Sequence, residues 1–169
     1  MKKLKTTLLV IALVYSIYYA SQLGDWHFID NINLIIHEAG HVVFMPFGEL
    51  LTLLGGSMLQ IIIPLIFAGY FLWTKKFISF GLMCFWASFN FFNVSVYAGD
   101  ALTMQLPLLT GDKDSHDWNQ ILFILGWLKH TSAISMVFYV FGWVVMLTGF
   151  LSSLLLYWLW DHEDYRVIE

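Results

Sequence analysis

Charged side chains are scarce in this chain. Only 12% of its 169 residues are Asp, Glu, Lys or Arg, whereas about a quarter are charged in an ordinary soluble domain. Hydrophobic residues make up 59% of the chain and aromatic residues 18%. This composition excludes a typical soluble protein and predicts a polytopic protein whose surroundings are a lipid bilayer. The length allows one integral-membrane domain, over residues 1–169.

Cysteine is nearly absent, and so is any patch in which basic and aromatic residues alternate. The single cysteine, Cys84, lies in an apolar run, so neither a disulfide within the chain nor a cysteine-based zinc site can form. No stretch interleaves basic with aromatic residues, so nucleic acid is not an expected partner.

Long apolar runs are what the chain has instead. They predict four membrane-spanning helices, at about 6–23, 49–73, 77–98 and 132–160. Two shorter helices, at about 29–45 and 118–129, are expected to be interfacial or re-entrant. The first run is long for a signal peptide, and Tyr18 stands where a cleavage site needs a small residue, so we expect a retained helix. The predicted fold class is therefore all-α.

The distribution of lysine and arginine predicts an orientation. With the N-terminus in the cytoplasm, six basic residues fall inside: Lys2, Lys3, Lys5, Lys75, Lys76 and Arg166. Only Lys113 and Lys129 fall outside, which satisfies the positive-inside rule. Both termini are then cytoplasmic, and segments 25–48 and 100–130 share the outer side. A site built from both segments would lie in the outer half of the membrane.

One motif places ionisable side chains inside an apolar run. Residues 37–41 read His-Glu-Ala-Gly-His, the H-E-x-x-H pattern. On a helix, His37 and His41 share a face, so both imidazoles can bind one zinc ion. Glu38 is then placed to act as general base on a metal-activated water. The alternative is three polar residues on the outer face of an interfacial helix, although ionisable residues at membrane depth generally indicate function.

The sequence "HEAGH" in an apolar helix of a small polytopic protein resembles the site-2-protease class of intramembrane zinc metalloproteases. The run "HEAGHVVFMPFGELLTLLGGSMLQIIIP", with "NVSVYAGDA", "LPLL" and "HDW", is similar to small bacterial membrane proteins related to that class. This closer resemblance covers most of residues 30–130. It implies zinc at His37 and His41, a base at Glu38, peptide-bond hydrolysis in or near the bilayer, and location in a bacterial inner membrane.

The third metal ligand departs from that class, which supplies it from an Asp-Gly pair preceded by an Asn. The nearest match here is Asp100, which follows Asn93 but precedes Ala101. We rank Asp100 first, with His116 and then Asp117 as alternatives. Asp117 and Gln120 also match a capping box that would open the 118–129 helix. Asp117 could instead orient a ligand histidine through the second ring nitrogen.

Three more polar residues lie inside predicted spans: Ser57, Gln60 and Asn93. An unpaired polar group in hydrocarbon costs several kcal/mol, so these side chains are expected to face protein or a water-filled cavity. One hypothesis is that these side chains bind substrate, with Asn93 donating a hydrogen bond to an oxyanion. The alternative is hydrogen bonding between packed helices.

These features favour an integral-membrane zinc metalloendopeptidase. Its substrate would be a membrane protein or a membrane-proximal peptide, hydrolysed with Glu38 as general base. A metal-binding membrane protein without proteolysis is one alternative, and it needs His37 and His41 but not Glu38. An inactive scaffold that binds transmembrane helices is another.

Overall fold

The computed structural model describes residues 2–108 and 111–160; Arg166, counted among the cytoplasmic charges, lies outside the described residues. The described chain is helical and has no β-strand. Its helices are α1 (Lys2–Ser21), α2 (Phe28–Phe44), α3 (Glu49–Trp73), α4 (Phe77–Gly99), α5 (Asp117–Ile124) and α6 (Thr131–Trp160). Short 3-10 turns connect them: η1 (Met45–Phe47), η2 (Lys113–Ser115) and η3 (Leu128–His130).

Four of these helices, α1, α3, α4 and α6, are long and apolar enough to cross a membrane. They lie within a few residues of the four predicted runs, which confirms the all-α fold with four candidate spans. Helices α2, with 17 residues, and α5, with 8, are shorter than the roughly 20 residues that a span needs. The prediction of a helix to residue 129 was wrong: α5 ends at Ile124, because Gly126 adopts a left-handed φ of 67°.

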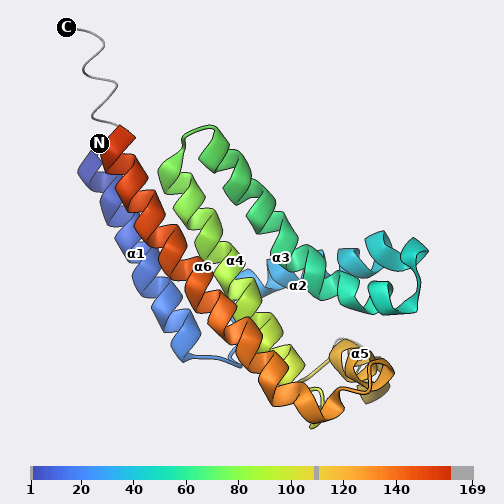
Figure 1. Cartoon of the computed structure of the whole chain (residues 1–169). Helices are drawn as coiled ribbons and strands as arrows, with labels where there is room; N and C mark the ends of the chain where they lie inside the picture. The colour runs from blue at the N-terminus through green and yellow to red at the C-terminus, as the bar shows by residue number, and fades with distance from the viewer. Residues whose placement is uncertain (1, 109–110, 161–169) are drawn as a thin grey trace, which may run out of the picture.

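Helix α4 occupies the middle of the bundle, where it packs against α6, α3 and α1 (Figure 1). Its aromatic side chains form a core with residues of α1 and α6, and the buried members include Phe85, Phe89, Phe92, Leu9 and Met146. Glycines of α6 let that helix approach closely. A Cβ on Gly149 would lie 2.2 Å from Cys84 Cβ, and one on Gly142 would lie 2.5 Å from the Phe92 ring. Small residues at such contacts are typical of helix packing in membranes.

The bundle has two chemically different ends. The N-terminus, the turn between α3 and α4, and the end of α6 lie together at one end, whereas α5 and the connection from α1 to α2 lie at the other (Figure 1). The first end carries lysines, and Lys75 Nζ lies 4.2 Å from the centre of the Trp160 ring. This arrangement agrees with the even number of crossings that the charge distribution predicts.

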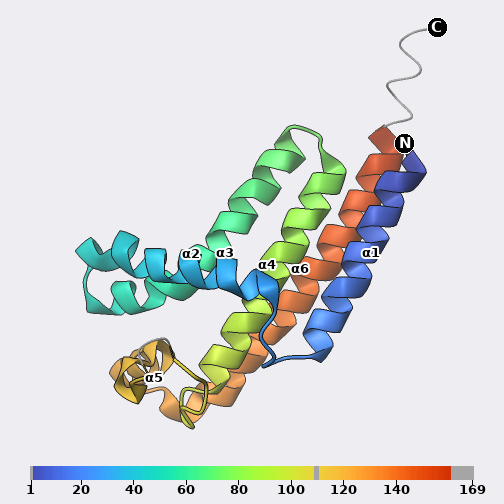
Figure 2. The ribbon, with the colours of Figure 1, turned by 180° about the vertical axis from the view of Figure 1, so that it is seen from behind.

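Helix α2 and the first part of α3 form a hairpin that projects sideways from the bundle (Figure 2). The two helices touch through backbone, because a Cβ on Gly40 would lie 2.2 Å from the carbonyl oxygen of Gly55. Farther along, α3 bends to run beside α4. Pro64 lies inside α3 and lacks the N–H that would bond the Gln60 carbonyl, which is a common cause of a bend. The hairpin places one face of α2 above α5.

Candidate metal centre

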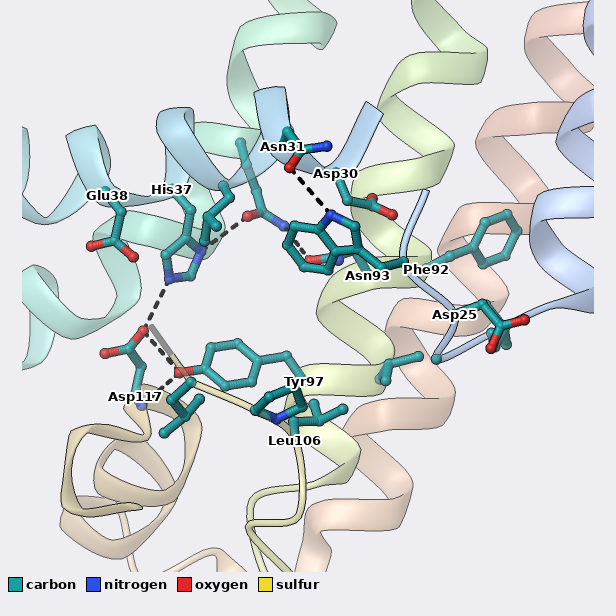
Figure 3. Close-up of a pocket in the computed structure, with 18 of the residues that line it drawn as sticks. Asp25, Asp30, Asn31, His37, Glu38, Phe92, Asn93, Tyr97, Leu106 and Asp117 are labelled. Carbon is teal, nitrogen blue, oxygen red and sulfur yellow. Dashed lines mark hydrogen bonds and ion pairs between the residues drawn. The ribbon is translucent and has the colours of Figure 1, made fainter. Parts of the chain in front are cut away.

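Side chains from α2 and α5 converge below the hairpin (Figure 3). His37 Nε2 lies 3.0 Å from Asp117 Oδ2, and His41 Nε2 lies 3.3 Å from the same oxygen. The three residues offer ligand atoms that all lie within 4.8 Å of one another. Tetrahedral bonds of about 2.0–2.1 Å place neighbouring ligand atoms about 3.3 Å apart. The spacing therefore suits one small divalent cation.

The second nitrogen of each imidazole fixes which nitrogen faces the centre. His37 Nδ1 lies 2.9 Å from Gln60 Oε1, and His41 Nδ1 lies 2.8 Å from the carbonyl oxygen of Thr52. Both partners only accept hydrogen bonds, so each Nδ1 carries a proton and donates it. The two Nε2 lone pairs and the Asp117 carboxylate then face one another. A metal ion at this point would satisfy all three acceptors together.

The arrangement favours a proton on His41. The hydrogen bond with Asp117 raises the pKa of His41 to about 9, although burial of the imidazole acts in the opposite direction. Burial raises the pKa of Asp117, but hydrogen bonds with His37 and His41 outweigh it and hold that pKa at about 2. A metal ion must therefore displace a tightly held proton from His41.

This gives a prediction for pH. The pKa of His41 is higher in the folded chain than in the unfolded chain, where it is about 6.5, so protonation of His41 stabilises the fold. This contribution is complete below about pH 6.5 and is lost as pH rises through about 9. The pKa of Asp117 is lower in the folded chain than in the unfolded chain, where it is about 3.9, so ionised Asp117 stabilises the fold. This contribution is complete above about pH 3.9 and is lost as pH falls through about 2. Thermal unfolding of the metal-free chain should show the contribution of this pair in full between about pH 4 and 6.5. Metal affinity should instead rise between about pH 7 and 9, and an affinity that falls across this range would contradict the assignment.

Asp117 is held by contacts at the start of α5. The N-cap is His116, whose Nδ1 accepts the N–H of Asn119 at 3.2 Å. The predicted capping box of Asp117 and Gln120 is therefore wrong, and Gln120 instead donates to the carbonyl of Asp114. Because His116 caps the helix, the Asp117 carboxylate can reach the histidines. The Tyr97 hydroxyl accepts the N–H of Asp117 at 3.0 Å and donates to its Oδ2 at 3.3 Å.

The other two candidates for third ligand have different partners. Asp100 accepts hydrogen bonds from the backbone N–H groups of Gln105 and Leu106 and from the Thr103 hydroxyl, so it organises its own loop. His116 is fully buried, with Nε2 at 3.5 Å from Asp100 Oδ2. Neither belongs to the group formed with His37 and His41. The structure places Asp117, the last of the three candidates in the sequence-based ranking, beside the two histidines.

Glu38 stands beside the metal-binding group on α2, with its carboxylate directed toward the same space (Figure 3). The side chain is exposed and lines a cavity of about 790 Å³ together with His37, His41 and Asp117. Within residues 2–108 and 111–160 its carboxylate makes no hydrogen bond or ion pair. It is therefore available to a water molecule or ligand in the cavity.

The three residues proposed for substrate binding divide into two groups. Gln60 and Asn93 line the cavity, and Gln60 Nε2 donates to Asn93 Oδ1 at 3.2 Å. Ser57 is buried outside the cavity lining, and its hydroxyl accepts the indole N–H of Trp118 at 3.0 Å, which ties α5 to α3. Sequence reasoning missed the contact of Tyr97 with Asp117 and of Gln60 with His37. The only signal for Gln60 was its isolation in an apolar run.

Gln60 provides a test of the histidine geometry. Gln60→Leu removes the acceptor for His37 Nδ1 while keeping a similar side-chain volume. We expect metal affinity to fall by about 10–100-fold, the usual cost of losing a partner that orients a ligand histidine. Titration calorimetry with zinc would measure it. The zinc affinity of the conservative variant Gln60→Asn should lie between those of Gln60→Leu and the parent. An unchanged affinity in Gln60→Leu would show that His37 needs no such partner.

Gly56 makes room for the His37 ring. A Cβ at this position would lie 2.5 Å from His37 Nε2, the nitrogen that faces the centre. Gly56→Ala should therefore displace the imidazole and weaken metal binding by at least about tenfold. Gly69→Ala on the same helix is the matched control, because no atom lies within 4 Å of a Cβ there. Equal metal affinity in the two variants would contradict the placement of His37.

Comparisons of the chain with protein-family models, with curated proteins and with solved structures find no match. The function of the site is therefore inferred from its own residues: the two histidines, the aspartate that joins them, and the neighbouring glutamate. Their arrangement supplies three ligand atoms and one unpaired carboxylate at the edge of a cavity.

Proposed function

We propose that this chain is an integral-membrane zinc metalloendopeptidase, with His37, His41 and Asp117 as metal ligands and Glu38 as general base. The observation that carries the proposal is the convergence of three acceptor atoms on one point, with Glu38 beside them. Two histidines and a carboxylate match the three protein ligands of catalytic zinc sites, which keep a fourth position for water.

The residues around the site have separate roles in this proposal. A bound zinc ion would supply Lewis acidity and lower the pKa of a water ligand to about 7. Glu38 accepts a proton as that water attacks the peptide carbonyl, and passes the proton to the leaving amine. Gln60 and the Thr52 carbonyl keep the imidazoles oriented. Tyr97 holds Asp117 in place and is a positioning residue.

The proposal includes a location. The end that carries Lys3, Lys5, Lys75 and Lys76 is placed in the cytoplasm on the positive-inside rule. The metal centre then lies toward the outer side of the membrane, and the resemblance of the HEAGH region points to a bacterial inner membrane. The substrate is a membrane protein or a membrane-proximal peptide.

A metal-exchange experiment tests this function. The full chain, purified in detergent and placed in lipid nanodiscs, is incubated with an unfolded protein substrate before and after chelation. We expect cleavage that stops on chelation and returns when one equivalent of zinc is added. Cleavage that persists in the fully chelated protein, or none at all in a zinc-loaded folded chain, would contradict the proposal.

A further inference from the structure

The lining of the cavity indicates where it opens. One wall comes from α2, α3 and α4, and its buried members include His37 and Gln60. Its outer wall comes from the connection between α1 and α2, where residues 22–26 are all exposed, and from the loop at 106–108. The connection between α1 and α2 and helix α5 lie at the end of the bundle opposite the N-terminus and the turn between α3 and α4 (Figure 2). Most of the exposed lining residues therefore lie in loops at that end of the bundle, and the others, Asn31 and Glu38, lie on α2.

The opposite face of α2 is apolar, and the described part of the chain leaves it exposed. Five side chains at helical spacing are exposed there: Phe28 82%, Ile32 40%, Ile35 70%, Val42 67% and Val43 53%. None of them lines the cavity. The candidate spans also expose apolar side chains, such as Ile66 of α3 at 63% exposure, and exposed apolar surface of this kind fits acyl chains. Helix α2 thus stands between the acyl chains and the metal centre.

The size of the cavity favours an extended occupant. A helix with its side chains is about 10–12 Å wide and rises about 5.4 Å per turn, which amounts to roughly 500 Å³ per turn. The cavity of about 790 Å³ is too small to enclose a whole spanning helix, which has more than about five turns. An extended segment of a few residues fits without this conflict.

The charge of the cavity lining also restricts which peptide can occupy the cavity. The charged residues that line the cavity are Asp25, Asp30, Glu38 and Asp117, and no lysine or arginine lines it among the described residues. With a zinc ion bound by Asp117, the negative charge of the lining still exceeds the positive charge of the metal, so the cavity disfavours acidic side chains and tolerates neutral or basic ones.

Resting on the proposed function, we infer that the substrate is an extended, neutral or basic peptide segment that enters from the loop end of the bundle. A transmembrane helix that slides in from the lipid is not the substrate, because α2 turns its apolar face to the lipid and its metal-binding face to the loops. The scissile segment must therefore lie outside the hydrocarbon, in an unfolded stretch beside the membrane or in a chain end.

Binding can be measured separately from hydrolysis. The full chain with Glu38→Gln and Cys84→Ala is given one new cysteine, either Gln22→Cys at the cavity opening or Ile35→Cys on the apolar face of α2. Each variant is coupled in detergent to a bulky maleimide and placed in nanodiscs. The probe is a short fluorescent peptide of Ala, Ser, Leu and Lys. The acidic comparison peptide has Glu in place of each Lys. The second comparison probe is a single membrane-spanning helix of Ala, Ser and Leu, without charged residues.

We expect the label at Gln22→Cys to weaken binding of the basic peptide by about tenfold or more, and the label at Ile35→Cys to change it less than about twofold. The acidic comparison peptide should bind about tenfold more weakly than the basic peptide in the unlabelled protein. The unlabelled form of each variant is its own control for folding. The opposite pattern of blocking, binding of the helix alone, or no binding of the basic peptide would overturn the inference.

The outcomes separate this inference from the protease proposal. A zinc-loaded parent that binds the basic peptide through the Gln22 side but never cleaves it would contradict the protease and leave the route standing. A parent that cleaves only the spanning helix would contradict the route and leave the protease standing.

Discussion

Glu38→Gln should retain its metal and lose hydrolysis by about 10²–10⁴-fold. The amide keeps the size of the side chain but cannot accept the proton of the attacking water. Glu38 is not one of the three residues that form the metal-binding group, so zinc content should stay near that of the parent. Cleavage rates and zinc content, measured on the same preparation, test both halves of this expectation.

Glu49→Gln is the matched control, because Glu49 is exposed at the start of α3 and does not line the cavity. It should leave both the rate and the zinc content unchanged. Full activity in Glu38→Gln would remove Glu38 from the role of base, and loss of zinc in that variant would make it a ligand.

Asp117→Asn should lose stoichiometric metal, while Asp100→Asn should keep it. The carboxylate of Asp117 lies 3.0 and 3.3 Å from the two imidazole Nε2 atoms, whereas that of Asp100 is engaged by its own loop. Loss of a residue that only orients a ligand weakens metal binding by at most about 100-fold. Loss of the ligand itself should therefore weaken zinc binding by more than about 100-fold. Zinc titration of the two variants measures the difference.

The same substitution at both positions makes the comparison a matched one. Asp100→Asn should lower thermal stability, because its loop loses charge-assisted hydrogen bonds, without releasing the metal. The reverse result, with metal lost from Asp100→Asn and kept in Asp117→Asn, would restore the sequence-based choice of Asp100.

The membrane helices could be predicted because the property that defines them is local. An apolar run of sufficient length is visible in sequence, and α3, predicted at about 49–73, spans Glu49–Trp73. The start and end of α5 were harder to predict from the sequence. His116 caps this helix through its imidazole, a role more often taken by Ser, Thr, Asp or Asn, and Gly126 ends it early.

The metal-binding group could be predicted only where its residues are neighbours in sequence. His37 and His41 share a helix face, so their spacing identifies them. Asp117 reaches His37 across 80 positions, and its placement depends on the Tyr97 hydroxyl and on the packing of α5 against α3. Local pattern contains no information on such tertiary contacts, so the motif-based ranking could not identify Asp117 as the residue that lies beside the two histidines.

The most direct test of the account is the zinc X-ray absorption spectrum of the purified parent chain loaded with one equivalent of zinc. The account predicts a bound ion with two imidazole nitrogens and oxygen donors at about 2.0–2.2 Å, and no sulfur. A folded chain that retains no zinc, or a spectrum that lacks scattering from two imidazoles, would contradict a metal centre formed by His37, His41 and Asp117.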